Sequence, residues 1–282
     1  MNSDDITRRD FVTMTVAGLA AAAGANASAQ QAVTETTVEI KTPDGTCDAA
    51  FIHPATGAHA AVIIWPDAFG LRPSMRDMAR RLAGEAGYSV LVPNPYYRVA
   101  KAPMWADAST VDFAAERGKL NPLMASITAP GTVEKDAPAF IAWLDAQPQV
   151  DRTKKVGTQG YCMGGALVVR TAAAVPDRVG AGASFHGGGL VTQNPASPHL
   201  LAPKIMARMY FGIATNDDMQ QPDAKTALKT AFDAARVPVE VEVYPMAQHG
   251  WCVPDMPNNL YSKADAERAW GKLIALYKAG LV

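Results

Sequence analysis

The sequence is poor in cysteine and has no excess of charge of either sign. Its three cysteines, Cys47, Cys162 and Cys252, form no C-x-x-C pair, so neither a zinc site nor a thioredoxin-like motif is expected. Lysine plus arginine is 26, aspartate plus glutamate is 27, and no run of like charges occurs. The net charge of -1 therefore gives no electrostatic reason to bind nucleic acid or an acidic membrane.

The N-terminus is the one segment with a targeting pattern. Residues 7–12 read Thr-Arg-Arg-Asp-Phe-Val, which resembles a twin-arginine export signal, and residues 27–29 are small, as signal peptidase requires. The apolar stretch between them is too short and too rich in alanine and glycine to span ~30 Å of hydrocarbon. We therefore expect residues 1–29 to be removed and the twin-arginine machinery to export the protein. The remaining single domain, residues 30–282, would be periplasmic or secreted and not inserted in the membrane.

The mature chain alternates strand and helix patterns. Two alternating segments flank the turn signal Pro43-Asp44-Gly45 and predict a β-hairpin. Short apolar runs predict strands buried on both faces, and segments with helical spacing separate them. The expected strands are 60–65, 88–92, 155–159, 179–184, 205–211 and 239–244, and the expected helices are 72–86, 133–145, 163–174, 222–235 and 262–278.

This alternation predicts the α/β class. We expect an α/β-hydrolase fold, a mostly parallel sheet with helices on both faces and the N-terminal β-hairpin at one edge. With 49% hydrophobic and 19% charged residues, the chain is long enough for one large core. Residues 96–131 have no clear period, and we expect a loop or a short-helix excursion there.

A glycine-flanked cysteine is the strongest chemical motif. Residues 160–165 read Gly-Tyr-Cys-Met-Gly-Gly between a short expected strand and an apolar helix, a cysteine version of the G-x-S-x-G nucleophile elbow. The turn is so sharp that side chains two residues before and after the nucleophile would collide, and Gly160 and Gly164 remove them. The helix N-terminus favours a thiolate at Cys162, and the Met163 N–H would point at an oxyanion. A structural turn or a non-hydrolytic thiol stays the alternative.

The order of the remaining triad residues selects the candidates for base and acid. An elbow hydrolase has its nucleophile first, then the acid, then the histidine. His249 follows the last expected strand and is the candidate base, whereas a packing or substrate-side role suits its competitor, His186, better. Asp217 and Asp218 follow the strand at 205–211. We favour Asp217 as the acid that orients the imidazole, and expect Asp218, the alternative acid, to cap the helix that begins near residue 222.

Taken together, these residues resemble the dienelactone hydrolase family of the α/β-hydrolase superfamily over most of the mature chain. The Gly-Tyr-Cys-Met-Gly-Gly segment matches the family's nucleophile at Cys162. The Tyr-Phe-Gly-Ile-Ala-Thr-Asn-Asp segment matches its aspartate at Asp217, and Gln-His-Gly matches its histidine at His249. The resemblance implies hydrolysis of a small-molecule carboxylic ester or lactone through a cysteine acyl-enzyme, with no metal or organic cofactor.

Further positions come from the resemblance alone. Asp67 stands where the family has a glutamate that helps to convert the cysteine to a thiolate, and its side chain is one methylene shorter. The Ala68 N–H would be the second oxyanion donor. Arg98 matches an arginine that holds the substrate carboxylate, whereas Val253 replaces a second arginine that some members carry. The resemblance therefore predicts a broader tolerance of neutral substrates than a strict dienelactone hydrolase has.

Two other functions stay open for this sequence. One is a thiol-dependent redox or peroxide-handling protein, in which Cys47 or Cys252 approaches Cys162 in space. The other is a non-catalytic binding protein that kept the fold. Ester turnover without a reductant would argue against the first, and failure of Cys162 to react with an electrophile would favour the second.

Overall fold

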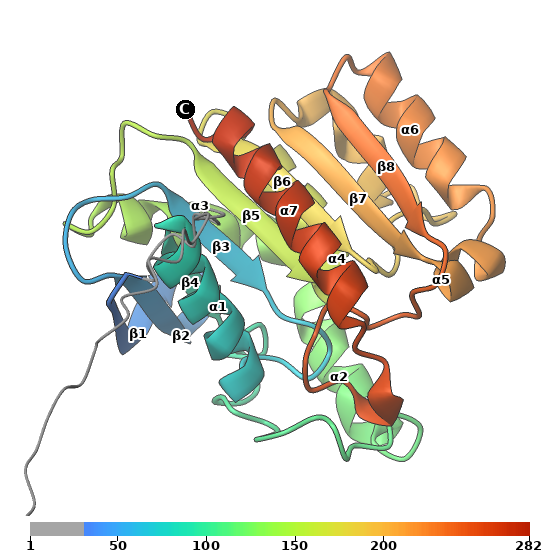
Figure 1. Cartoon of the computed structure of the whole chain (residues 1–282), viewed down its shortest axis with the longest axis horizontal. Coiled ribbons are helices and arrows are strands. Elements are labelled where there is room, and N and C mark those ends of the chain that lie inside the picture. Colours follow the sequence, from blue (N-terminus) through green and yellow to red (C-terminus); the bar gives the residue numbers. More distant parts are fainter. Residues whose placement is uncertain (1–30) are drawn as a thin grey trace, which may run out of the picture.

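The computed structural model describes residues 31–282, so the expected export signal and its cleavage site lie outside the described residues. One eight-stranded sheet has the order β1-β2-β4-β3-β5-β6-β7-β8 (Figure 1). The strands are β1 (Val33–Thr42), β2 (Gly45–Pro54), β3 (Ala61–Trp65), β4 (Ser89–Pro93), β5 (Val156–Tyr161), β6 (Val179–Phe185), β7 (Arg208–Ala214) and β8 (Val239–Tyr244).

Helices cover both faces of this sheet. The α-helices are α1 (Pro73–Ala86), α2 (Arg117–Thr128), α3 (Thr132–Asp145), α4 (Met163–Ala174), α5 (Thr215–Gln220), α6 (Ala224–Ala234) and α7 (Lys263–Gly280), and the 3-10 helices are η1 (Pro198–Lys204) and η2 (Pro257–Asn259). Within the described part of the chain, none of them is long and apolar enough to cross a membrane.

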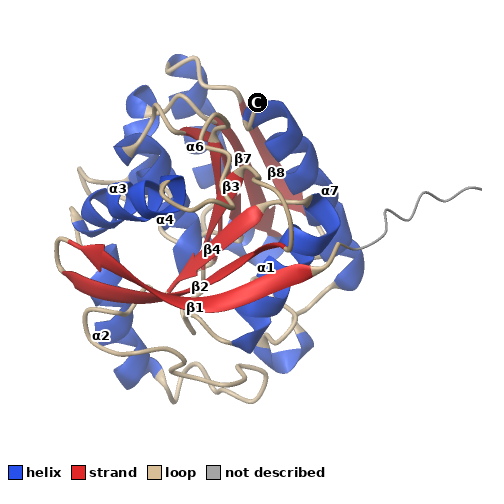
Figure 2. Ribbon diagram, turned by 90° about the vertical axis from the view of Figure 1, so that its left-hand side faces the viewer, coloured by secondary structure: helices blue, strands red, loops and turns tan. Residues whose placement is uncertain are grey.

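The sheet is parallel except at the hairpin edge. β1 pairs antiparallel with β2, and β2 pairs antiparallel with β4, whereas β4, β3, β5, β6, β7 and β8 form parallel pairs. Figure 2 shows the long β1–β2 hairpin crossing the edge of the sheet at a steep angle to the distant strands. The expected α/β-hydrolase architecture, with its hairpin at one edge, is therefore confirmed.

Two apolar cores explain why the central strands are apolar along their whole length. In β3, Ile63 and Trp65 pack with α3 and α4, whereas Val62 and Ile64 pack with α1 and α7 on the other face. Figure 1 shows α1 and α7 in front of the sheet and α4 behind it. Because successive side chains of a strand point to opposite faces, burial on both faces requires an unbroken apolar run.

Two segments differ from the sequence prediction. β7 begins at Arg208, three residues later than expected, because the prolines of η1 shape the chain up to Lys204 as a 3-10 helix. The 96–131 segment contains α2, a full helix of 12 residues whose buried stripe is Leu120, Leu123 and Ile127. Gly118 and Pro122 lower its helix propensity and hid this stripe in the sequence.

The 96–131 segment also covers the carboxyl end of β3. A small apolar cluster joins Ala68 and Phe69, just past β3, to Leu120 of α2. The Trp105 ring packs edge-on against Phe69 at 5.7 Å, and the Phe113 ring does so at 6.1 Å. This cluster shields the loop that carries Ala68 from solvent.

Candidate active site

The candidate residues meet at one edge of the sheet. Cys162 follows β5 directly, and His186 follows β6. Asp217 lies in α5 just past β7, and His249 follows β8 after a four-residue loop. Ala68 follows β3 on the same side. Because the carboxyl ends of parallel strands share an edge, segments 180 residues apart in sequence converge there.

Cys162 occupies a backbone conformation that L residues rarely adopt. Its φ is 51° and its ψ is -116°, at the N-terminus of α4. A Cβ on Gly160 would lie 2.2 Å from the Gly164 carbonyl oxygen, and a Cβ on Gly164 would lie 2.4 Å from the Trp65 carbonyl oxygen. The first glycine therefore removes the collision within the elbow, while the second lets the elbow approach the end of β3.

His249 connects the thiol to a carboxylate. Its Nδ1 lies 2.8 Å from Oδ2 and 3.0 Å from Oδ1 of Asp217, and its backbone N–H donates to the Asn216 side chain at 2.8 Å. Burial alone would lower the pKa of His249, but its interactions with Asp217 and Cys162, through hydrogen bonding and charge, outweigh burial and raise the pKa to about 10. The imidazolium form of His249 is thereby favoured at neutral pH.

The two adjacent aspartates bind different partners. Both lie in the first turn of α5, but only Asp217 contacts His249. Asp218 forms an ion pair with Lys225 of α6, with Nζ 2.6 and 2.8 Å from its carboxylate oxygens. The expectation that Asp218 caps the next helix is wrong, because Asp223 stands at the N-cap of α6 and Lys225 reaches back to Asp218.

Asp67 shapes the loop that presents the Ala68 N–H. Its side chain accepts the Phe69 N–H at 2.9 Å, and its carbonyl, in the same peptide group as the Ala68 N–H, accepts the Gly70 N–H at 3.0 Å. Both carboxylate oxygens also bind the Arg72 guanidinium, at 2.7 and 2.9 Å, and the side chain is 1% exposed. This corrects the expectation for Asp67, because a carboxylate held in this way is not free to act on Cys162.

The two expected oxyanion donors have no acceptor elsewhere in the described part of the chain. Among residues 31–282, neither the Ala68 N–H nor the Met163 N–H donates a hydrogen bond to another group of the chain. Met163 is the first residue of α4, so its N–H has no partner within the helix. The Tyr96 hydroxyl donates to the Ala68 carbonyl at 2.6 Å and contacts the Met163 sulfur at 3.6 Å, which ties the two donor segments together.

Arg72 also connects this loop to the histidine loop. Its Nε and Nη2 each lie 2.7 Å from a carboxylate oxygen of Asp255, six residues past His249. Burial raises the pKa of Asp255, but the hydrogen bonds and charge of Arg72 outweigh this effect and hold the pKa below its usual value. The fully buried guanidinium is thus paired with two carboxylates, one from each loop.

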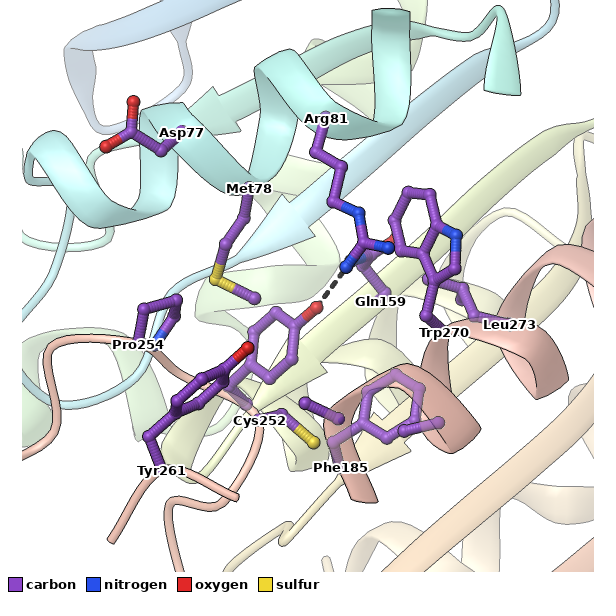
Figure 3. Close-up of a pocket in the computed structure, with 13 residues that line it drawn as sticks. Asp77, Met78, Arg81, Gln159, Phe185, Cys252, Pro254, Tyr261, Trp270 and Leu273 are labelled. Atoms are coloured by element: carbon purple, nitrogen blue, oxygen red, sulfur yellow. Dashed lines mark hydrogen bonds between the residues drawn. The ribbon is translucent and has the colours of Figure 1, made fainter. Parts of the chain in front are cut away.

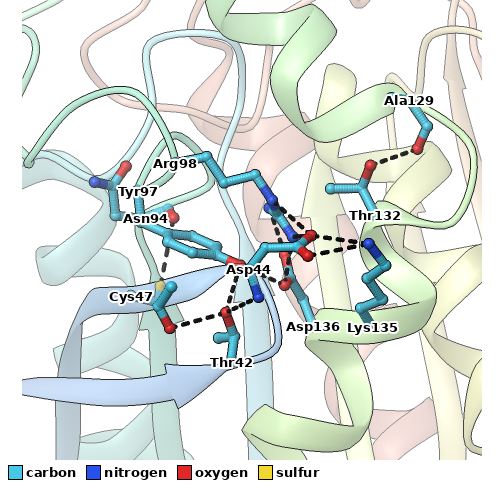
Figure 4. Close-up of polar contacts among 11 residues, drawn as sticks. Thr42, Asp44, Cys47, Asn94, Tyr97, Arg98, Ala129, Thr132, Lys135 and Asp136 are labelled. Atoms are coloured by element: carbon cyan, nitrogen blue, oxygen red, sulfur yellow. Dashed lines mark hydrogen bonds and ion pairs between the residues drawn. The ribbon is translucent and has the colours of Figure 1, made fainter.

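The structure also corrects the expectation that Arg98 is free to hold a substrate carboxylate. Its guanidinium donates to Asp136 at 2.7 and 2.9 Å and to Asp44 at 3.0 and 3.2 Å, so all three of its nitrogens are engaged (Figure 4). Tyr97 donates to the same Asp136 at 2.7 Å, and Lys135 also reaches Asp44. Arg98 therefore joins the β1–β2 turn to α3.

The three cysteines have different surroundings. Cys47 and Cys252 are buried, and burial, as the main cause, raises the pKa of each thiol. Cys162 is partly accessible, and all three thiols are free within the described residues. In residues 31–282, no disulfide joins Cys162 to Cys47 or Cys252.

A separate cavity of about 240 Å³ lies between α1 and α7 (Figure 3). Tyr161 and Phe185, which precede Cys162 and His186, form part of its wall with Cys252, and neither Cys162 nor His249 lines it. Because neighbouring strand residues point to opposite faces, this cavity lies behind the candidate site and is not its substrate pocket.

The fold and the converging elbow, histidine and aspartate define an α/β-hydrolase-fold enzyme. The family model for the dienelactone hydrolase family matches residues 47–281. The chain belongs to this family and is therefore a hydrolase of the ester- and lactone-cleaving class.

Relatives and solved structures agree with this assignment. A Synechocystis sp. protein, provisionally named a carboxymethylenebutenolidase, is 30% identical over 80% of this chain and 89% of its own. The carboxymethylenebutenolidase of Rhodococcus opacus is 26% identical over 84% of this chain and 88% of its own. The metagenomic dienelactone hydrolase-like promiscuous phosphotriesterase P91 shares the fold, with a TM-score of 0.69, 23% identity, and coverage of 89% of this chain and 100% of P91.

The elbow contacts predict a sharp difference between two glycines. Gly164→Ala should destabilise the protein by about 1–3 kcal/mol or more, because its Cβ would meet the Trp65 and Pro66 carbonyl oxygens. Gly118→Ala in α2 is the control, since an added Cβ has nothing within 4 Å, and it should stabilise the protein by about 0.4–1 kcal/mol. Urea unfolding measures both, and similar free energies of unfolding for the two variants would contradict the elbow geometry.

The His249 contacts predict its titration. NMR of the imidazole Cε1–H against pH should give a midpoint near 10. Since this folded-state pKa is above the usual value of 6.5, the stabilisation is complete below about pH 6.5 and lost as the pH rises through about 10. Asp217→Asn should lower the midpoint, whereas Asp218→Asn, the matched control, should leave it unchanged. A midpoint that moves only with Asp218→Asn would reverse the assignment.

Proposed function

We propose that this protein hydrolyses a small-molecule carboxylic ester or lactone through an acyl-enzyme on Cys162. The observation that carries the proposal is the His249 imidazole, whose Nδ1 hydrogen bonds to Asp217 and whose pKa is raised by both Asp217 and the neighbouring Cys162. A nucleophile, a base and an orienting acid in this order are the parts that acyl transfer requires.

In the first step, the Cys162 thiolate attacks the substrate carbonyl carbon. The negative charge that develops on the carbonyl oxygen is bound by the Ala68 and Met163 N–H groups, which have no other acceptor among residues 31–282. When the C–O bond breaks, the His249 imidazolium donates its proton to the leaving alkoxide. In a lactone the leaving group stays attached to the acyl chain, as an alcohol.

In the second step, His249, now neutral, accepts a proton from water. The water oxygen attacks the thioester carbonyl, the same two N–H groups hold the oxyanion, and the C–S bond breaks to release the carboxylic acid and the thiolate. Asp217 accepts a hydrogen bond from His249 Nδ1 and stabilises the imidazolium in both steps. His249 gives up one proton in the first step and regains one in the second, so the cycle consumes only water and the ester.

The substrate is proposed to need no carboxylate of its own. Arg98 already binds Asp44 and Asp136, and Val253 is buried and apolar. Phe69 and Trp105 pack beside Ala68 and make this side of the site apolar. Neutral esters and lactones fit these surroundings.

The test of this proposal is hydrolysis by Cys162→Ala. Turnover of p-nitrophenyl acetate and of a lactone panel should fall by about three orders of magnitude or more, because loss of a nucleophile removes the acyl-enzyme. Cys47→Ala is the matched control and should retain the activity, since Cys47 is buried in the hairpin. Cys162→Ser should be nearly as inactive as Cys162→Ala, because an alcohol needs a stronger base than a thiol does. Hydrolysis by Cys162→Ala at a rate similar to wild type would refute the proposal.

We also propose that the protein is exported by the twin-arginine machinery to the periplasm or the medium. The support is the Arg8-Arg9 pair and the small residues at 27–29. The mature N-terminus should be Gln30, and the double variant Arg8→Lys, Arg9→Lys should leave the precursor inside the cell although its charge is unchanged. Cell fractionation and N-terminal mass spectrometry measure this, and an exported protein that still begins at Met1 or Asn2 would rule out the signal.

A further inference from the structure

The turn after β6 holds both sides of the nucleophile's backbone. The Cys162 N–H points between two acceptors, the His186 Nδ1 at 3.1 Å and the Phe185 carbonyl at 3.2 Å. The Cys162 carbonyl accepts the N–H groups of Gly165 and Gly188, each at 3.0 Å. The Phe185 bond continues the pairing of β5 with β6 past Tyr161, whereas His186 and Gly188 add two contacts that are specific to the elbow.

His186 also contacts the second half of the reacting pair. Its ring centroid lies 4.8 Å from that of His249 at an interplanar angle of 63°, and 5.2 Å from that of Trp251. The side chain is fully buried, and its backbone has a left-handed φ of 41°. One imidazole therefore touches both the Cys162 peptide and the His249 ring.

The hydrogen bond from Cys162 fixes the state of this imidazole. Because Nδ1 accepts a hydrogen bond from a backbone N–H, the ring is neutral and its own proton is on Nε2. Burial first, and then the neighbouring His249, lower the pKa of His186 well below its usual value, which agrees with a neutral ring. Nε2 has no partner among the described residues, so the side chain makes its only polar contact through Nδ1.

These contacts exclude His186 as the base that the sequence left open. A base needs a nitrogen directed at the thiol and a group that stabilises its cation. Nδ1 is occupied by the Cys162 N–H, and no carboxylate contacts the ring in residues 31–282. His249 has both features.

We propose that His186 is a positioning residue for the cysteine chemistry. Its Nδ1 holds the strained Cys162 peptide, and its ring supports the His249 imidazole, so that the thiol and the imidazole stay within hydrogen-bonding reach. The proposal rests on the proposed role of Cys162. A rare backbone conformation persists only where its surroundings over-determine it, and the His186 contact is one of the few side-chain contacts available for this.

Three substitutions of His186 distinguish a positioning role from a role in packing alone. In His186→Asn, Oδ1 replaces Nδ1 at the same branch position and accepts the Cys162 N–H, and asparagine tolerates a left-handed φ. His186→Leu has the same branching and no acceptor. His186→Gly has no acceptor either, but it adopts a φ of 41° without strain.

The readouts are kcat and KM for p-nitrophenyl acetate and the rate at which iodoacetamide alkylates Cys162. His186→Leu and His186→Gly should lower kcat by about a hundredfold with KM changed less than threefold, because misplacement of reacting groups acts on the chemical step. His186→Asn should stay within about tenfold of wild type. The alkylation rate of Cys162 should also be near the wild-type rate in His186→Asn and much lower in His186→Leu and His186→Gly. Mass spectrometry maps the alkylation, with Cys162→Ala as the blank.

Two results would overturn the proposal. One is that both His186→Leu and His186→Gly have the kcat and the Cys162 alkylation rate of the wild-type protein. The other is an equal loss in His186→Asn and the variants without an acceptor, at unchanged thermal stability. If His186→Leu does not fold, His186→Gly and His186→Asn decide the question. The two proposals can fail independently. Hydrolysis by Cys162→Ala at the wild-type rate refutes the proposed function. The alkylation rates of the His186 variants would still show whether His186 positions Cys162.

Discussion

The strained backbone at Cys162 is the constraint on which the rest of the site depends. A residue with φ 51° and ψ -116° costs on the order of 1–3 kcal/mol relative to a relaxed conformation. The conformation is held because β5 ends against β6, α4 begins at Met163, and the turn at residues 186–188 binds the Cys162 peptide from both sides. It places the thiol at the sheet edge, at the positive end of α4 and beside His249.

A buried cation fixes the loops around this thiol. Arg72 binds Asp67 in the oxyanion loop and Asp255 in the histidine loop, so the two loops are coupled although they are far apart in sequence. Burying a charge is unfavourable unless it is paired, and here every charged oxygen and nitrogen of the trio has a partner. The arrangement holds the Ala68 N–H in one position. An oxyanion donor that is already in position needs no reorganisation during the reaction.

The chain departs from the family pattern at linked positions. Where the resemblance implied a switching carboxylate and a substrate clamp, Asp67 binds Arg72, and Arg98 binds Asp44 and Asp136. Both arginines therefore stabilise loops, and neither of these two guanidinium groups is free to bind an anionic substrate. The candidate nucleophile, base and acid, Cys162, His249 and Asp217, still converge at the sheet edge beside the apolar cluster that covers the end of β3.

Local pattern in the sequence was enough for the fold and the order of the site. Burial on both faces gives the central strands unbroken apolar runs, and the elbow turn requires glycine at 160 and 164, so both features are visible without coordinates. The α2 stripe was obscured by Gly118 and Pro122. Only the tertiary structure distinguished Asp217, which contacts His249, from Asp218. It also showed that Asp67 and Arg98 bind other side chains of the protein. Finally, it placed the His186 ring in contact with both the Cys162 peptide and the His249 ring. These outcomes depend on which distant side chains meet, and spacing along one chain carries no such information.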